Sequence, residues 1–155
     1  MDITIQGVVR KELSTHPDER GYFRELIRVT DDFFDKRFGQ WSHSWMHQGV
    51  LKAWHLHRIQ TDYWYVCGGV LRVGLCDVRP ASPTRSRIVE FLMGEGQPAW
   101  VLKIPPGVAH GCKVVRGPAN LLYMTSEIYN PADELRLPPD TPDIPFDWTA
   151  DPAVP

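Results

Sequence analysis

Short runs of hydrophobic residues, separated by turn-forming residues, occupy most of the chain up to about residue 130. Valine, isoleucine, leucine and aromatic residues dominate these runs, as is typical of β-strands. The runs predicted to be strands are residues 22–29, 50–57, 63–66, 70–77, 87–91, 100–104, 112–115 and 121–125. Glycine and proline predict turns at residues 68–69, 80–83, 94–96, 105–107 and 116–118. This spacing of short strands predicts an all-β sandwich or barrel.

Two segments depart from the strand pattern. Residues 30–38 are predicted to form one short helix, because Thr30 or Asp31 can cap it and Phe34 and Phe38 are spaced by one helical turn. The Pro-rich C-terminal tail, from about residue 131 to 155, carries seven of the 14 prolines. It therefore cannot form a continuous helix or a central strand. The length of 155 residues predicts a single domain over residues 1–155.

Charge and composition exclude several classes of function. The 17 Lys and Arg residues against 19 Asp and Glu residues give a net charge of -2, so no bulk positive field is available to bind nucleic acid. The sequence shows neither a signal peptide nor a run of roughly 18 apolar residues, so we expect no membrane partner and a cytoplasmic protein. Cys67, Cys76 and Cys112 lack C-x-x-C spacing and are expected to be buried free thiols.

The candidate chemistry centres on two histidines of one predicted strand. His55 and His57 are two residues apart, so both side chains project from the same face. An imidazole near neutral pH can accept a proton, donate one or bind a transition metal, although a hydrogen-bonded structural pair is the alternative interpretation. Lys52 has the opposite strand parity to His55. Both can line one site only if a β-bulge lies near Ala53.

The residues around these histidines follow two spaced motifs. They are Gly49, His55-x-His57, Asp62 and Gly69, followed by Pro105-x-Gly107-x-x-His110. The spacing resembles the two motifs of the cupins. The resemblance implies a cupin-type jelly roll, a double-stranded β-helix barrel whose mouth holds a site. In a metal-dependent cupin, one divalent transition metal would be bound by His55, His57, Asp62 and His110.

A larger set of motifs covers most of the chain. It comprises Asp18-x-Arg20-Gly21-x-Phe23-x-Glu25, Gln40, Ser44, Gly49-Val50-Leu51, His55, Asp77-x-Arg79, Ser82-Pro83-Thr84, Ile104-Pro105-x-Gly107-x-Ala109-His110-Gly111, Tyr129-x-Pro131 and Trp148. Together these motifs are similar to the dTDP-4-dehydrorhamnose 3,5-epimerase family, a branch of the cupins. The resemblance implies a homodimer without metal or other cofactor, acting on a dTDP-4-keto-6-deoxy sugar.

The family's reaction explains the types of residue that are present. Epimerisation removes a proton from a carbon next to a ketone and returns one to the other face, which needs a base, an acid and a group that stabilises the enolate. By position in the family, His55 matches the base and Tyr129 the acid. Asp140 matches the carboxylate that orients the histidine, with Asp143 as the competing match.

The resemblance also implies a set of substrate-binding residues. The family positions that hold the nucleotide, partly across the dimer interface, correspond in this chain to Arg20, Phe23, Glu25 and Gln40. Two further positions at the family's site correspond to Lys52 and His110. Two positions differ in charge from the family pattern. Lys52 stands where the family has Arg, and Asp62 stands where it has Lys, so the cationic charge near the ketone and phosphates is reduced.

Three alternatives to the epimerase remain. The pair His55-x-His57 with the following Gln60 resembles the dTDP-sugar 3,4-ketoisomerases, which move a proton between adjacent carbons with two histidines. A metal-dependent cupin enzyme would account best for Asp62, because a carboxylate completes a ligand set with the histidines. The third alternative is a binding module for a sugar nucleotide that has lost the chemistry.

Overall fold

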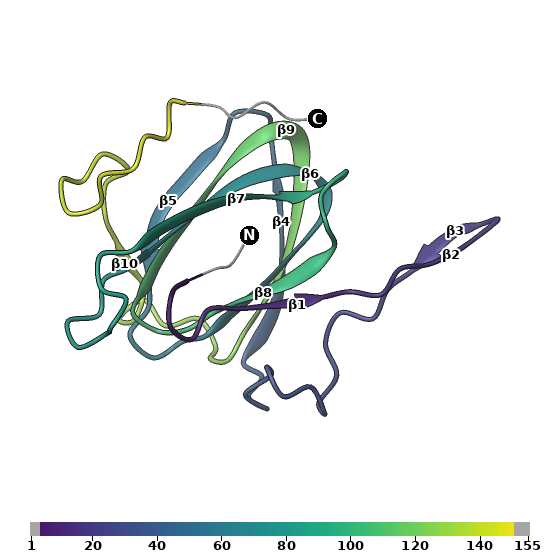
Figure 1. The fold of residues 1–155 in the computed structure, drawn as a ribbon, viewed down its shortest axis with the longest axis horizontal. Helices are drawn as coiled ribbons and strands as arrows, with labels where there is room; N and C mark the ends of the chain where they lie inside the picture. Colours follow the sequence, from purple (N-terminus) through teal and green to yellow (C-terminus); the bar gives the residue numbers. More distant parts are fainter. Residues whose placement is uncertain (1–3, 151–155) are drawn as a thin grey trace.

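Two long antiparallel strands, β6 and β9, form the frame of the molecule (Figure 1). The computed structural model describes residues 4–150, and within them no helix is present. The strands are β1 (Val9–Glu12), β2 (His16–Asp18), β3 (Gly21–Phe23), β4 (Gln40–Met46), β5 (Leu51–Leu56), β6 (Asp62–Asp77), β7 (Ile88–Gly94), β8 (Trp100–Ile104), β9 (Val108–Thr125) and β10 (Leu135–Arg136). The predicted all-β, cupin-type jelly roll is confirmed.

Strands β6 and β9 pair along almost their whole length and pass through both layers of the barrel. The first part of β6 pairs with β8, which pairs with β1, and the last part of β9 pairs with β4. In the other layer, the second part of β6 pairs with β7, and the first part of β9 pairs with β5, which pairs with β10. The buried core between the layers includes Leu71, Val73, Leu102 and Val114.

The turn predicted at residues 68–69 is wrong, because β6 continues through it with an irregular register against β9. Gly69 has φ +68°, and a Cβ there would lie 2.6 Å from the carbonyl oxygens of Arg116 and Pro118. Only glycine tolerates this close approach of the two strands. The turn predicted at residues 116–118 is wrong for the same reason, since those residues form the β9 side of the irregularity.

The irregular register also changes which residues of β6 face the barrel interior. Before the glycine pair, the even-numbered Trp64 packs in the interior cluster. After it, the odd-numbered Leu71 and Val73 do so. Asp62 has the parity of Trp64, so it points inward, where it is buried and lines the pocket.

The helix predicted over residues 30–38 is wrong. Phe33 and Phe34 instead lie edge-on against Tyr63, with ring centroids 5.7 Å and 5.6 Å away, and so cover the outer face of β6. The backbone N–H of Asp35 donates to the Tyr63 hydroxyl at 3.0 Å, and Lys36 has φ 58°, which no right-handed helix permits. Burial of the two aromatic rings therefore outweighs the helical spacing.

The C-terminal tail covers the outer face of the other layer. Trp54 of β5 is fully buried against Phe146 and Trp148, with ring centroids 5.4 Å and 5.0 Å away. Strand β10 is only two residues long and lies at the sheet edge beside β5, which agrees with the exclusion of a central strand. Residues 151–155 of the predicted tail lie outside the described residues.

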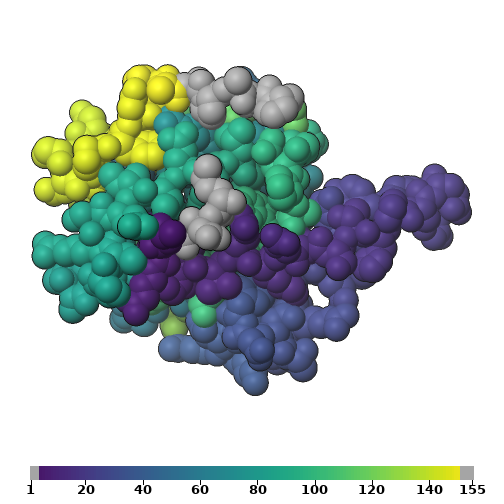
Figure 2. Space-filling view, viewed as in Figure 1, coloured from purple at the N-terminus to yellow at the C-terminus, as the bar shows by residue number. Residues whose placement is uncertain are grey.

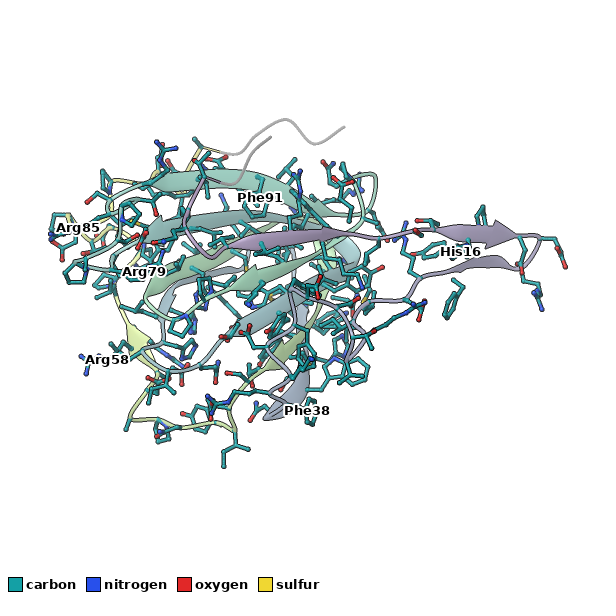
Figure 3. The ribbon with its side chains drawn as sticks, turned by 60° about the horizontal axis from the view of Figure 1, so that its bottom comes forward. His16, Phe38, Arg58, Arg79, Arg85 and Phe91 are labelled. Atoms are coloured by element: carbon teal, nitrogen blue, oxygen red, sulfur yellow. The ribbon has the colours of Figure 1, made fainter. Side chains whose placement is uncertain are left out.

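Strands β2 and β3 form an arm that projects from the barrel (Figures 1 and 2). Figure 3 shows His16 on this arm, at the end of the molecule opposite to Arg58 and Arg85. Tyr22 and Phe23 of β3 are 57% and 62% exposed, so the arm presents two aromatic side chains that its own barrel leaves uncovered.

Candidate active site

A pocket of about 650 Å³ opens into the barrel between β4, β5, β6 and β9. Its volume lies within the range of small-molecule sites. Six of the residues predicted for the site line it, namely Gln40, Lys52, His55, His57, His110 and Tyr129, and Asp62 does so as well. The structure therefore brings together side chains from positions 40 to 136 of the sequence.

His55 enters the pocket from β5, opposite His110 of β9 in the strand register. The two rings are stacked, with centroids 6.2 Å apart. Nδ1 of His55 lies 3.4 Å from Oε1 of Glu134. Burial lowers the pKa of His55 below its ordinary value, and this outweighs the opposite effect of Glu134. A neutral imidazole in this position has a nitrogen available to accept a proton.

The structure brings neither Asp140 nor Asp143 to His55. Both residues are exposed and neither lines the pocket, so the structure does not place the predicted Asp140 beside the histidine. The carboxylate beside His55 is Glu134, because β10 pairs with β5 and sets Arg136 opposite His55. The chain then turns away through Pro138 and Pro139, which carries Asp140 out of reach.

Tyr129 stands at the pocket mouth with its side chain 63% exposed. Its backbone N–H donates to Oε1 of Gln40 at 2.8 Å, so Gln40 fixes the start of the loop that carries the tyrosine. Burial alone would raise the pKa of Glu134, but hydrogen bonds from Arg136 and, to a smaller extent, from the Tyr129 hydroxyl lower it. Tyr129 and His55 therefore share one carboxylate as a neighbour.

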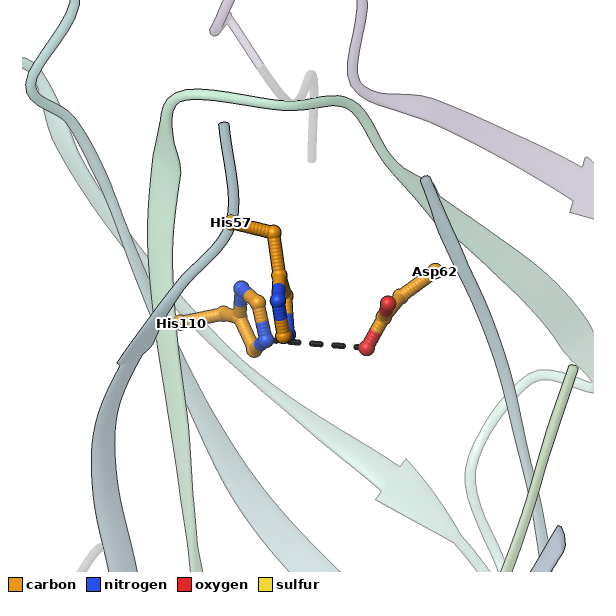
Figure 4. A group of neighbouring side chains, drawn as sticks. All are labelled: His57, Asp62 and His110. Carbon is orange, nitrogen blue, oxygen red and sulfur yellow. Dashed lines mark ion pairs between the residues drawn. The ribbon is translucent and has the colours of Figure 1, made fainter. Parts of the chain in front are cut away.

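His57, Asp62 and His110, which all line the pocket, form a tight cluster (Figure 4). Nε2 of His110 lies 3.6 Å from Oδ2 of Asp62, and the rings of His57 and His110 have centroids 5.6 Å apart. Both His110 and Asp62 are almost fully buried, at 3% and 5% exposure. Burial lowers the pKa of His110 despite the nearby carboxylate.

Sequence reasoning missed Asp133, which organises the loop after β5. Its carboxylate accepts hydrogen bonds from the backbone N–H groups of Arg58, Ile59 and Gln60 at 2.9, 3.3 and 3.2 Å. Its carbonyl oxygen lies 3.2 Å from Nδ1 of His57. The sequence holds no signal for this residue, because its partners lie more than 70 positions away.

The bulge predicted near Ala53 is confirmed, since the register of β5 against β9 shifts between Lys52 and His55. Lys52 lines the pocket as a result, and its Nζ donates to Oγ of Ser44 at 2.9 Å. Arg136 is a second cation at the pocket and bonds to Glu134 at 2.7 Å.

Three predicted binding residues lie outside the pocket of their own chain. Arg20, at the tip of the arm, pairs with Asp18, while Phe23 lies on β3 and Glu25 pairs with Arg28. None of the three lines the pocket.

The fold and the pocket define a cupin-type barrel with an interior site of histidines, carboxylates and one tyrosine. The sequence profile of the dTDP-4-dehydrorhamnose 3,5-epimerases matches residues 2–154. The chain therefore belongs to the dTDP-4-dehydrorhamnose 3,5-epimerase family. Within residues 4–150, no helix of the length and apolarity needed to cross a membrane is found.

One relative and two solved structures illustrate the similarity. The chain is 41% identical to the spore coat polysaccharide biosynthesis protein SpsL of Bacillus subtilis, over 95% of this chain and 98% of that protein. A dTDP sugar isomerase from Desulfovibrio desulfuricans superimposes with a TM-score of 0.88 at 31% identity, over 95% of this chain and 94% of that one. A dTDP-6-deoxy-D-glucose-3,5-epimerase from Legionella pneumophila, solved with dTDP-4-keto-L-rhamnose, gives 0.86 at 26% identity, over 100% and 85%.

Proposed function

We propose that this protein is an epimerase of a dTDP-4-keto-6-deoxy sugar, which removes and returns a proton at C3, C5 or both. The single observation that carries the proposal is the arrangement of His55, Glu134 and Tyr129 around one pocket in a member of this family. The Legionella relative, solved with a dTDP-4-keto sugar, supports the substrate class.

In the proposed reaction, His55 removes the proton next to the ketone. Glu134 lies at Nδ1 and holds the ring so that Nε2 is the basic nitrogen. Tyr129 then donates a proton to the other face of the carbon, and its contact with Glu134 keeps the hydroxyl near that pocket wall. Lys52 is a nearby cation for the enolate oxygen or the phosphates. The proton itself is carried by side chains of the protein in both steps.

We further propose a homodimer in which the arm of one chain reaches the pocket of its partner. The exposed Phe23 and Arg20, which are outside their own pocket, support this arrangement. A complementation experiment tests it: a His55→Asn chain is mixed with a chain carrying Arg20→Ala and Phe23→Ala. If the sites are shared, mixing two impaired proteins restores activity, because one pocket of each mixed dimer has an intact histidine and an intact arm. If the mixture is no more active than its parts, the shared site is wrong.

We also propose a cytoplasmic location, supported by the three free cysteines, since reduced thiols are usual in that compartment. A second candidate reaction, 3,4-ketoisomerisation, is favoured by one observation: His57 lines the same pocket as His55 and can serve as a second proton carrier.

The experiment that tests the function is NMR of dTDP-4-keto-6-deoxyglucose incubated with the protein in deuterated buffer. Loss of the C3 and C5 proton signals with new resonances of an epimerised sugar supports the epimerase. A product with its ketone at C3 instead indicates the ketoisomerase. No exchange over hours, with folded protein, contradicts both reactions.

A further inference from the structure

The donor atoms of His57, Asp62 and His110 converge on one point inside the barrel (Figure 4). One ligand atom from each residue lies within 4.8 Å of the other two. We propose that these three residues bind a divalent first-row transition metal ion. His55 is not part of this group, so the proposed site has two imidazoles and one carboxylate.

Each of the two histidines has its Nδ1 bound to a backbone carbonyl oxygen. Nδ1 of His57 lies 3.2 Å from the carbonyl of Asp133, and Nδ1 of His110 lies 3.0 Å from the carbonyl of Val108. A carbonyl oxygen only accepts, so both Nδ1 atoms carry the hydrogen, and in the neutral rings both Nε2 atoms carry a free electron pair. Metal-binding histidines in proteins are held in this way by a partner on the other ring nitrogen.

The carboxylate of Asp62 is held in a similar manner. Nε2 of Gln60 donates to its Oδ1 at 2.6 Å, and Nε1 of Trp64 donates to its Oδ2 at 3.2 Å. Oδ2 also faces Nε2 of His110 at 3.6 Å. Two electron pairs thus face each other in a buried site. A positive ion between them removes this repulsion, and it takes the place of the Gln60 amide as the partner of Nε2 of His57.

The spacing fits an ion of this class after a small adjustment. Nitrogen and oxygen ligands about 2.1 Å from a tetrahedral ion lie roughly 3.4 Å apart, close to the separation of Asp62 and His110. His57 must turn slightly inward, which displaces Gln60, whose amide nitrogen lies 3.3 Å from Nε2 of His57. Two imidazoles and a carboxylate suit Zn²⁺, Mn²⁺, Fe²⁺ or Co²⁺ and leave coordination positions open toward the pocket.

The role of the ion rests on the proposed function. The two cations that line the pocket are each bound to a neighbour, Lys52 to Ser44 and Arg136 to Glu134. A divalent ion next to His110, whose ring stacks on His55, adds positive charge near the carbon that His55 deprotonates. Such an ion polarises the ketone oxygen of the substrate and so favours loss of the adjacent proton.

The test is direct metal binding, without substrate. Untagged protein is stripped with a chelator and titrated with Co²⁺, followed by visible absorption, and with Zn²⁺, followed by calorimetry. We expect one ion per chain. The variants Asp62→Asn and His57→Gln should bind the metal at least about 100-fold more weakly. Loss of a residue that only hydrogen-bonds to a metal ligand already lowers metal affinity roughly 10- to 100-fold.

Two controls make the result specific to this cluster. His43→Gln removes an exposed imidazole outside the pocket, and His55→Asn removes an imidazole inside the pocket but outside the cluster. Both should bind metal as the unmodified protein does. The proposal is overturned if folded protein binds no ion up to millimolar concentration, or if Asp62→Asn and His57→Gln bind as tightly as the controls. Failure of the proposed function gives a different result from failure of the metal site: the protein then binds the metal but exchanges no proton of the substrate.

Discussion

Nδ1 of His55 lies 3.4 Å from Oε1 of Glu134, and the pairing of β10 with β5 holds the two residues together. Glu134 is also bonded to Arg136 and Tyr129. One carboxylate thus connects the proposed base to the proposed acid. In the family resemblance this carboxylate was expected at Asp140, which the structure leaves exposed.

The first prediction separates these two carboxylates. Glu134→Gln should lower kcat at least about tenfold with little change in KM, because the imidazole of His55 loses its orienting charge. Asp140→Asn should leave both constants unchanged. His55→Asn should lower kcat by about 10²- to 10⁴-fold, the usual contribution of a general base. Steady-state kinetics, with a melting curve of each variant, measure this. A loss in Asp140→Asn equal to that in Glu134→Gln would restore Asp140 as the partner.

The second prediction concerns the two halves of the proton transfer. In Tyr129→Phe, His55 still removes a proton, but the acid on the other face is missing. Deuterium should therefore enter the substrate faster than the epimerised product forms. Because Tyr129 is 63% exposed, the variant should melt like the unmodified protein. NMR in deuterated buffer gives both rates. Equal slowing of exchange and of product formation would show that Tyr129 is not the separate acid.

The third prediction concerns the loop that Asp133 organises. Asp133→Ala removes the acceptor of three backbone N–H groups, so the free energy of unfolding should fall by about 1–3 kcal/mol. Asp140→Ala, an exposed carboxylate in the same tail, should change it by less than about 0.5 kcal/mol. Urea denaturation of both variants measures the difference. Similar values for the two would mean that the three hydrogen bonds contribute little.

The fourth prediction is a loss of stability in acid from Asp77. Burial alone would raise the pKa of this carboxyl group, but hydrogen bonds from Arg79, Ser82 and Thr84 together hold the pKa well below its ordinary value of 3.8. The pKa of Asp77 is thus lower in the folded protein than in the unfolded chain. Asp77 therefore contributes its full stabilisation above the pKa of the unfolded chain, and this stabilisation is lost as the pH falls from there toward the pKa in the folded protein.

Urea denaturation between pH 7 and pH 3 tests this contribution. Removing two of the donors, in Ser82→Ala and Thr84→Ala, should raise the folded pKa and flatten the fall of stability in acid. Ser86→Ala, in the same loop but without a contact to Asp77 through its hydroxyl, is the matched control. If Ser82→Ala and Thr84→Ala lose stability in acid as steeply as the unmodified protein, the acid sensitivity comes from other carboxylates.

The fifth prediction is that one thiol reacts quickly and two react slowly. Cys67 is exposed, which corrects the expectation that all three cysteines are buried. Burial raises the pKa of Cys76 to about 11 and that of Cys112 to about 12, so few thiolates are present at neutral pH. A thiol reagent such as DTNB should modify one group rapidly in the native protein, and Cys67→Ser should abolish that phase. A fast phase that remains in Cys67→Ser would contradict this.

Local sequence was a sufficient guide where a residue's role depends on its immediate neighbours. The alternation of side chains in β5 placed His55 and His57 on one face, and the opposite parity of Lys52 required the bulge that the structure contains. Strand β8 has the predicted bounds of residues 100–104. The spacing of the glycines and histidines was enough to indicate the barrel, and the larger set of motifs from Asp18 to Trp148 indicated its family.

Tertiary contacts decided the features that local pattern described wrongly. Gly68 and Gly69 read as a turn, but the close approach of β9 makes them an irregularity inside one long strand. Residues 30–38 have helical spacing, but Phe33 and Phe34 instead pack edge-on against Tyr63.

The chain by itself thus determined the class of barrel and seven of the side chains that line its pocket. Only the folded molecule decided that Glu134, not Asp140, accompanies His55, and that Asp133 supports His57. The physical reason is that each of these contacts joins strands or loops more than 70 residues apart, so no periodicity along the chain records them. They exist because β10 docks on the edge of β5.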